Sequence, residues 1–178
     1  VIYDRNNVPL AWNIENPNNP DFSLRKFAEM PGLSNLLGYV KYPTKDSSGF
    51  YFREDFVGVG GIEKYFNDAL QGKNGMKLTE TNALGKTQSE GILQPPITGR
   101  NLTLTIDSRV QSALYSFIAE LAEKTPFDGG AAVIMDVRTG EVIAQVNYPE
   151  YNSQVLTDGT DKEKIKEFTQ DKNNPFLD

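Results

Sequence analysis

The chain has 178 residues, a formal net charge of −6 at pH 7 and a mean hydropathy of −0.47, which suits one full domain, or one and a fraction, with a modest core. It contains no cysteine and no histidine, which excludes disulfides, a cysteine nucleophile, imidazole-ligated metals and a Ser-His-Asp triad. The acidic balance argues against nucleic acid as a partner, and no segment has the apolar length of a membrane span. Because the sequence begins at Val1 rather than methionine, we expect an excised piece whose targeting segment has been removed.

The N-terminal part of the chain predicts extended segments and one short helix. Val1–Asn13 predicts extended backbone with a turn at Asn6-Asn7. Ser23 is a candidate cap for a helix over Leu24–Met30. The apolar run Leu33–Tyr42 then predicts a strand.

A helix and a ribbon are predicted next. Gly72 stands where a C-terminal glycine cap belongs. Met76–Gln94 is too polar to bury and has turn residues at Asn82–Gly85, so we expect two exposed arms that project as a ribbon. The helix before Gly72 has one apolar face, because its apolar residues recur at helical spacing: Ile62, Tyr65, Phe66, Ala69 and Leu70.

The longest predicted helix follows a half-buried strand. Leu102, Leu104 and Ile106 alternate with threonines, which is typical of a strand with one buried face. Asp107 caps the helix and Thr125-Pro126 ends it. A continuous apolar stripe runs along its length: Val110, Ala113, Leu114, Phe117, Ile118, Leu121 and Ala122.

The stretch Gly129–Asn152 predicts a β-hairpin. Its arms are Ala131–Val137 and Glu141–Val146, with turn chemistry at Asp136–Gly140, and Pro149 ends the pairing because it has no amide hydrogen to donate. The first arm is apolar on both faces, which favours cover on both sides. We therefore expect one face to pack on the helix stripe, and the other face, or a free edge, to await strands outside this chain.

Five segments that span most of the chain carry a family resemblance. They are Ile2-Tyr3-Asp4-Arg5-Asn6 with Leu10-Ala11, Leu36-Leu37-Gly38-Tyr39-Val40, Gly60-Gly61-Ile62-Glu63 with Tyr65, Leu70, Gly72 and Gly75, Leu102–Asp107 with Gln111, and Gly130–Tyr151. In this order they resemble class B penicillin-binding proteins, the peptidoglycan D,D-transpeptidase family, from the membrane-proximal start to the first two strands of the transpeptidase domain. The sequence departs from the family at Asn7, which is usually glycine, and at Asn35, which is often histidine. The short segment between Ala11 and Leu33 implies that a head subdomain is reduced or missing.

The resemblance implies an α+β fold. Mixed helices and antiparallel strands would form an elongated N-terminal pedestal module of the dimerisation type over residues 1–126, and residues 127–178 would begin a transpeptidase (β-lactamase-like) sheet with its first β-hairpin. The implied function is a non-catalytic pedestal that positions the transpeptidase domain on the outer face of the bacterial cytoplasmic membrane, with an N-terminal membrane helix outside this chain. The parent would acylate a serine with the D-Ala-D-Ala end of a stem peptide and pass the acyl group to a neighbouring amine.

The resemblance also implies partners. They are the remainder of the transpeptidase domain, a SEDS-type membrane glycosyltransferase, elongation or division proteins, and self-association as a further option. A stand-alone cell-envelope binding module is the alternative hypothesis.

The family's catalytic motifs are S-x-x-K, S-x-N and K-T-G. One formal match, Ser23-Leu24-Arg25-Lys26, lies far upstream of the predicted transpeptidase strands, and Lys86-Thr87-Gln88 only approaches K-T-G. The resemblance puts the family's serine beyond Asp178. The sequence therefore predicts no catalytic, cofactor-binding or metal-binding residue, and the chain by itself is not predicted to be an enzyme. A complete enzyme that uses Ser23 and Lys26 is the rival hypothesis.

Isolated carboxylates favour structural roles over chemistry. Glu63 predicts a first-turn acid, stabilised by the dipole of its helix, rather than a general acid or base. Asp136 and Glu141 offer a carboxylate pair of the kind that glycosidases use, but their position at a hairpin turn favours solvation.

For the C-terminal segment and for one set of aromatic residues, the sequence also favours structural roles. Asp161–Gln170 predicts a charged helix, while Asp158, Asp161 and Glu163 lack the glycine and register of a calcium loop. For one aromatic set, general burial tendencies favour core packing over an exposed partner patch: Phe50, Tyr51, Phe52, Phe56 and Tyr65.

Overall fold

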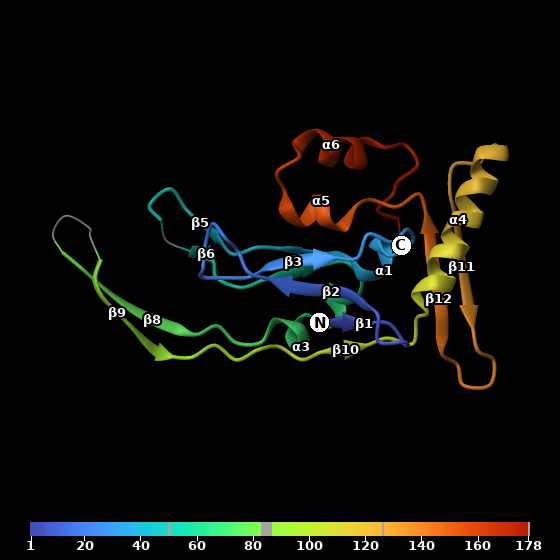
Figure 1. Cartoon of the computed structure of the whole chain (residues 1–178). Helices are drawn as coiled ribbons and strands as arrows, with labels where there is room; N and C mark the ends of the chain where they lie inside the picture. Colours follow the sequence, from blue (N-terminus) through green and yellow to red (C-terminus); the bar gives the residue numbers. More distant parts are fainter. Residues whose placement is uncertain (50, 83–86, 126, 178) are drawn as a thin grey trace.

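A computed structural model describes residues 1–49, 51–82, 87–125 and 127–177 of the chain (Figure 1). Within these ranges the strands form one four-stranded sheet and four two-stranded sheets, and six helices accompany them. The pairings are antiparallel except for one parallel pair. The predicted mixture of helices and antiparallel strands is therefore present. Two hairpin arms project from one end of the molecule, and the longest helix lies against a third hairpin at the other end (Figure 1).

The four-stranded sheet contributes most of the side chains of the main core. Its order is β10-β1-β2-β3, with β1 at Ile2–Tyr3, β2 at Pro9–Ile14, β3 at Leu24–Phe27 and β10 at Leu102–Thr103. The predicted turn before β2 is confirmed, because Asn7 has a φ of 62° there. The core consists of buried apolar side chains: Ile2, Leu10, Ala11, Phe27, Leu33 and Leu37.

The helix predicted over Leu24–Met30 is wrong. The segment is β3, paired with β2 in a register that sets Phe27 opposite Ala11. Arg25 and Phe27 are buried while Leu24 and Lys26, which alternate with them, are half-exposed, and this two-residue period is that of a strand. Pairing with β2 and burial of this alternation outweigh a local cap signal, because intrinsic helix propensity is a weak preference.

The single strand predicted over Leu33–Tyr42 is also wrong. The segment forms a helical turn, α1 at Ser34–Leu37, and then β4 at Tyr39–Lys41, which pairs with β7 at Val57–Val59. Gly38 separates them with a φ of 77°, and a Cβ there would lie 2.0 Å from the Gly60 carbonyl oxygen. The glycine thus permits both the left-handed backbone and the close approach of the next segment.

One projecting arm carries β5 at Thr44–Lys45 and β6 at Tyr51–Arg53. The helix predicted around Ile62 is present as two short pieces, α2 at Gly61–Tyr65 and α3 at Asn67–Gln71. The predicted glycine cap is confirmed, since α3 ends at Gly72 with a φ of 76°.

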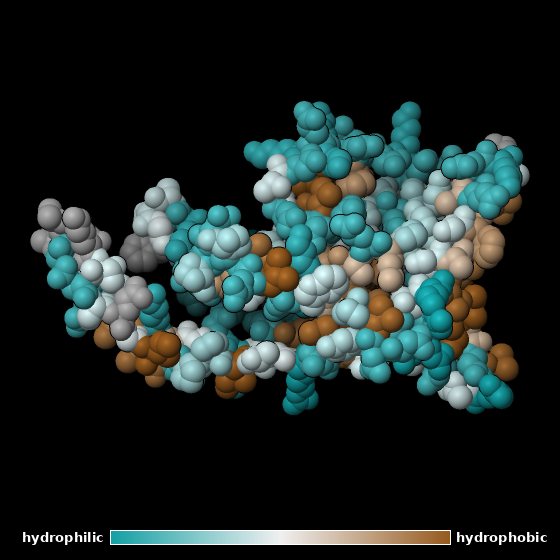
Figure 2. Space-filling model, in the orientation of Figure 1, coloured by the Kyte–Doolittle hydropathy of each residue, from teal (hydrophilic) through white to brown (hydrophobic). Residues whose placement is uncertain are grey.

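The second arm is the predicted ribbon. It pairs β8 at Met76–Thr81 with β9 at Thr87–Gln94 and extends away from the body (Figure 1). Of the predicted turn at Asn82–Gly85, residues 83–85 lie outside the described residues. Apolar side chains gather near the base of the ribbon (Figure 2), where four large ones are more than half-exposed: Met76, Leu78, Ile92 and Leu93.

Helix α4 spans Ser108–Lys124, and the Asp107 carboxylate caps it by accepting hydrogen bonds from the amides of Arg109 and Val110. The strand expected before it is shorter than predicted, since only Leu102–Thr103 pair as β10, although Ile106 is buried. The apolar stripe is covered only in part, because Phe117 is 69% and Leu121 is 53% exposed. Among the described residues no helix is long and apolar enough to cross a membrane.

The C-terminal hairpin pairs β11 at Gly130–Met135 with β12 at Val142–Tyr148, and β12 ends just before Pro149 as predicted. Gly140 closes the turn with a φ of 77°. The predicted charged helix is present as α6 at Lys162–Gln170, capped by Asp161. A further helix that the sequence did not predict, α5 at Ser153–Asp158, lies above β3 (Figure 1).

Candidate functional site

The one S-x-x-K match does not have the geometry of a nucleophile. The family motif needs serine and lysine one helical turn apart, but here Ser23 precedes a strand and Lys26 lies on it. Three residues of strand span roughly 10 Å, and successive side chains point to opposite faces. Ser23 is therefore neither a helix cap nor, with Lys26, a nucleophile pair.

Glu63 lies in the first turn of α2, as predicted, but its partner is a side chain that the sequence did not reveal. The Nε of Arg25 donates to Glu63 Oε1 at 2.7 Å, and the two side chains are only 8% and 4% exposed. Arg25 Nη1 also donates to Asn13 Oδ1 at 2.9 Å. Burial raises the pKa of Glu63, and the adjacent guanidinium opposes that rise. The buried pair joins β3 to α2, and its enclosure suits a structural role.

Four of the other carboxylates singled out in the sequence each bond to a different partner, so they form no shared site. Asp136 accepts from Arg138 at the hairpin turn, whereas Glu141 pairs with Arg5 at 3.2 Å. Asp161 caps α6 and Asp158 accepts from Gln154. No cluster of three metal-ligating side chains occurs in the part of the chain that the structure describes.

The prediction of core packing for the aromatic set is wrong for two members. Phe52 is 65% exposed and Tyr65 is 82% exposed. Phe56 does pack, edge-on against Phe22 and Tyr42 with ring centroids 6.0 and 5.7 Å apart. Both exposed rings lie on short elements, β6 and α2, which have too little neighbouring chain to cover them. Phe50 lies outside the described residues.

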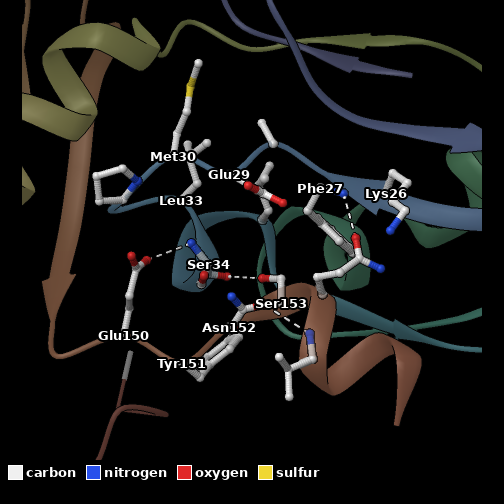
Figure 3. A pocket seen from close by; sticks show the side chains of 15 residues that line it. Lys26, Phe27, Glu29, Met30, Leu33, Ser34, Glu150, Tyr151, Asn152 and Ser153 are labelled. Atoms are coloured by element: carbon white, nitrogen blue, oxygen red, sulfur yellow. Dashed lines mark hydrogen bonds between the residues drawn. The ribbon is translucent and has the colours of Figure 1, made fainter. Parts of the chain in front are cut away.

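A cavity of about 490 Å³ lies between the β3–α1 segment and residues 150–155 (Figure 3). Glu150 forms one of its walls. The Glu150 carboxylate accepts from the backbone amides of Gly32 at 2.8 Å and Ser34 at 3.0 Å. Burial raises the pKa of Glu150, and these two amides oppose the rise. The carboxylate thus holds the loop before α1 against the end of the hairpin.

Helix α5 is joined to the same region by side chains that bond to backbone groups. Gln154 Oε1 accepts from the amide of Phe27 at 3.2 Å, and its Nε2 donates to the carbonyl of Arg25 at 3.1 Å. Thr157 Oγ1 accepts from the amide of Val40 at 3.2 Å. These bonds occupy edge groups of β3 and β4, so α5 lies across the gap between two sheets.

The outer edge of β12 is closed by the chain itself. Gln111 is fully buried on α4; its Oε1 accepts from the amide of Gln145 at 2.8 Å, and its Nε2 donates to the carbonyl oxygens of Gln145 and Gly32. The Asp107 amide donates to Ile143 and the Thr105 hydroxyl to Val142 on the same edge. The side-chain amide acts there as a neighbouring strand would.

The outer edge of β11 is open. Within the described residues β11 pairs only with β12, and α4 packs mainly on β12. Val133 is 58%, Ile134 is 40% and Met135 is 53% exposed. This agrees with the expectation of an uncovered face and edge, and it corrects the detail that the helix stripe covers the first arm. The second arm is the one that the helix covers.

This arrangement defines a scaffold module with an open sheet edge, and comparisons with known proteins identify its family. Residues 21–104 match the model described as the penicillin-binding protein dimerisation domain. The chain is 30% identical to peptidoglycan D,D-transpeptidase MrdA of Haemophilus influenzae over 153 residues, which are 81% of this chain and 22% of that protein.

Two solved structures are similar as well. One is of the complex between penicillin-binding protein PBP2 and MreC from Helicobacter pylori, with a TM-score of 0.60, 31% identity and coverage of 88% of this chain and 29% of that one. The other concerns the structural coordination of polymerization and crosslinking by a peptidoglycan synthase complex, with a TM-score of 0.64, 27% identity and coverage of 86% and 29%. The chain belongs to the class B penicillin-binding protein family and carries its dimerisation, or pedestal, domain. It spans between 22% and 29% of the length of these relatives.

Proposed function

We propose that the chain is a non-catalytic pedestal that positions a transpeptidase domain. In this proposal residues 1–126 are the pedestal module and residues 127–178 begin the transpeptidase domain. The observation that carries the proposal is the asymmetry of the C-terminal hairpin: Gln111 closes the outer edge of β12, while the outer edge of β11 is apolar and pairs with no other strand of the described residues. A strand supplied by the rest of a transpeptidase domain would complete the sheet at β11.

The free energy available at this edge supports the proposal. Fully burying a Val, Ile or Met side chain contributes about 1.5–3 kcal/mol. Val133, Ile134 and Met135 are about half-exposed, so covering all three contributes about 2–4 kcal/mol before any backbone hydrogen bonds form. An apolar unpaired edge is also a ready partner for another strand.

The hydrogen bonds at the cavity support the proposed positioning role. Glu150, Gln154 and Thr157 bond to backbone groups of the first 40 residues, so the start of the proposed transpeptidase domain is fixed to the pedestal at several points. In the whole protein this attachment would set the height and orientation of a serine D,D-transpeptidase that cross-links peptidoglycan.

The proposed partners beyond the transpeptidase domain are a SEDS-type glycosyltransferase and proteins of elongation or division. Support comes from the similar solved structures, one of a complex with MreC and one of a synthase that couples polymerization to crosslinking. A protein with these partners would work on the outer face of the cytoplasmic membrane, held there by an anchor segment.

A binding experiment tests the proposal. The remainder of a matching transpeptidase domain, expressed separately with an affinity tag, should retain the chain, and Val133→Lys should abolish retention by introducing a charge into the β11 contact. Val137→Lys is the matched control, because Val137 is 95% exposed beyond the end of β11. If the chain is not retained, or if both lysine variants behave alike, it is a stand-alone envelope module and the proposal fails.

A further inference from the structure

A second, smaller groove of about 260 Å³ lies where α1, α2 and β12 meet. Its walls are Asn35 and Leu36 from α1, Ile62 and Tyr65 from α2, and Gln145 and Asn147 from β12. None of these side chains carries a charge at neutral pH. The groove therefore suits a neutral group, and it is smaller than the roughly 300–1,000 Å³ typical of sites for drug-sized ligands.

Asn35 is the unusual residue of this groove. It is only 9% exposed, and neither its Oδ1 nor its Nδ2 has a hydrogen-bond partner among the described residues. A buried amide without partners costs free energy, and the great majority of buried polar groups in proteins are paired. A side chain that makes no bonds within the described chain, at a groove lined by further amides, points to a partner from outside.

The molecule itself contains an example of the partner that such an amide accepts. The buried Gln111 side chain bonds to both the N–H and the C=O of one strand residue, Gln145. A primary amide offers one acceptor and one donor side by side, so its complement is a group with an adjacent donor and acceptor, which is a secondary amide. Asn35 carries the same functional group, and its Oδ1 and Nδ2 bond to no group in the part of the chain that the structure describes.

The rest of the groove fits the surroundings of a secondary amide. Leu36 and Ile62 offer apolar contact to a carbon atom bonded to the secondary amide, such as the methyl carbon of an acetamido group. Tyr65 is 82% exposed and stands at the rim, where its ring can lie against a sugar or peptide. The side chains of Tyr65 and Gln145 are exposed, so they have room to adjust to a ligand.

We propose that this groove binds a neutral ligand through a secondary amide, with Asn35 as the side chain that recognises it. The choice of ligands rests on the proposed function, because peptidoglycan offers two sources of this group: the acetamido group of an N-acetylated sugar and the peptide bond. The inference goes beyond positioning, since it gives the pedestal a contact with cell-wall material.

Nuclear magnetic resonance titration of the whole chain tests the proposal with one probe for each source. The probes are N,N′,N″-triacetylchitotriose, which carries acetamido groups, and N-acetyl-L-alanine methylamide, which carries peptide bonds. With at least one probe we expect shifts at the Asn35 side-chain amide and along residues 61–65 and 145–147. The responding probe identifies the source. No shift at these residues with either probe would overturn the proposal.

Two variants sharpen the test. Asn35→Leu should abolish the response while leaving the melting temperature unchanged or higher, because leucine removes an amide that has no partner in the free chain. A lower melting temperature would overturn the proposal, since it would show that Asn35 has partners in the free chain.

Tyr65→Ala, at an exposed position that leaves folding intact, should weaken binding roughly two- to tenfold. Phe52→Ala removes an equally exposed ring elsewhere and should leave binding unchanged; equal effects at the two rings would contradict the proposed site. Retention by the transpeptidase remainder is measured separately, so the failure of one proposal is distinguishable from the failure of the other.

Discussion

Replacing Gln111 by leucine should remove the hydrogen bonds that this side chain of α4 makes to the backbone of Gln145 on β12. The side chain is fully buried and serves three backbone groups, the amide and carbonyl of Gln145 and the carbonyl of Gly32. Leucine fills a similar volume but leaves all three without that partner. An unsatisfied buried group costs about 1–3 kcal/mol, and water can reach the half-buried Gln145 backbone, so we expect a loss of about 3–5 kcal/mol. This is a large part of the roughly 5–15 kcal/mol by which domains are stable.

Urea denaturation followed by circular dichroism measures this loss. The midpoint should fall while the slope stays the same, because the change weakens the folded state without altering the surface that unfolding exposes. Gln145→Leu is the matched control, since only the backbone of Gln145 takes part and its side chain is exposed; it should cost less than about 0.5 kcal/mol. A Gln111→Leu protein within about 1 kcal/mol of wild type would refute the reasoning that this amide closes the β12 edge.

Three further predictions follow from the site. Because burial raises the pKa of Glu150, the folded state binds the Glu150 proton more tightly than the unfolded state does. The unfolding free energy of wild type should therefore fall relative to that of Glu150→Gln as the pH rises from 4.5 through the folded pKa. Parallel curves of unfolding free energy against pH for the two proteins would contradict this prediction. Phe56→Ala should cost about 2 kcal/mol in thermal denaturation, whereas Phe52→Ala and Tyr65→Ala should each cost less than about 0.5 kcal/mol; equal losses at all three positions would argue against the observed exposures. Intact-protein mass spectrometry should detect no covalent adduct after incubation with a β-lactam, and a stoichiometric adduct lost in Ser23→Ala would overturn the non-catalytic reading.

Features encoded by a few neighbouring residues could be predicted from the sequence. Asp107 caps α4, Gly72 ends α3 and Gly140 closes the hairpin turn, each with the backbone conformation its residue type favours. The stretch Met76–Gln94 projects as a ribbon, as predicted from its polar residues, although Met76, Leu78, Ile92 and Leu93 remain exposed on it. The open edge of the first hairpin arm was also predicted, since β11 is apolar on both faces.

Features that depend on distant partners could not be predicted. Leu24–Phe27 is a strand because β2 lies beside it, and a helix cap signal at Ser23 carries no information about that pairing. Arg25 and Glu63 are 38 residues apart, so neither announces the other in the sequence. Helix α5 likewise owes its place to bonds with backbone groups more than 100 residues earlier.

Hydrogen exchange at β11 tests the central claim most directly. In the chain alone, the amides of Gly130–Met135 that do not bond to β12 should exchange almost without protection, whereas the Gln145 amide, held by Gln111, should be protected. If the proposal holds, addition of the remainder of a matching transpeptidase domain should slow exchange of the open β11 amides by a hundredfold or more, about 2.7 kcal/mol in opening free energy, and leave exchange of the Gln145 amide unchanged. If the outward amides of β11 are already protected in the chain alone, or stay fast in the presence of that domain, the chain does not present the first strands of a transpeptidase sheet.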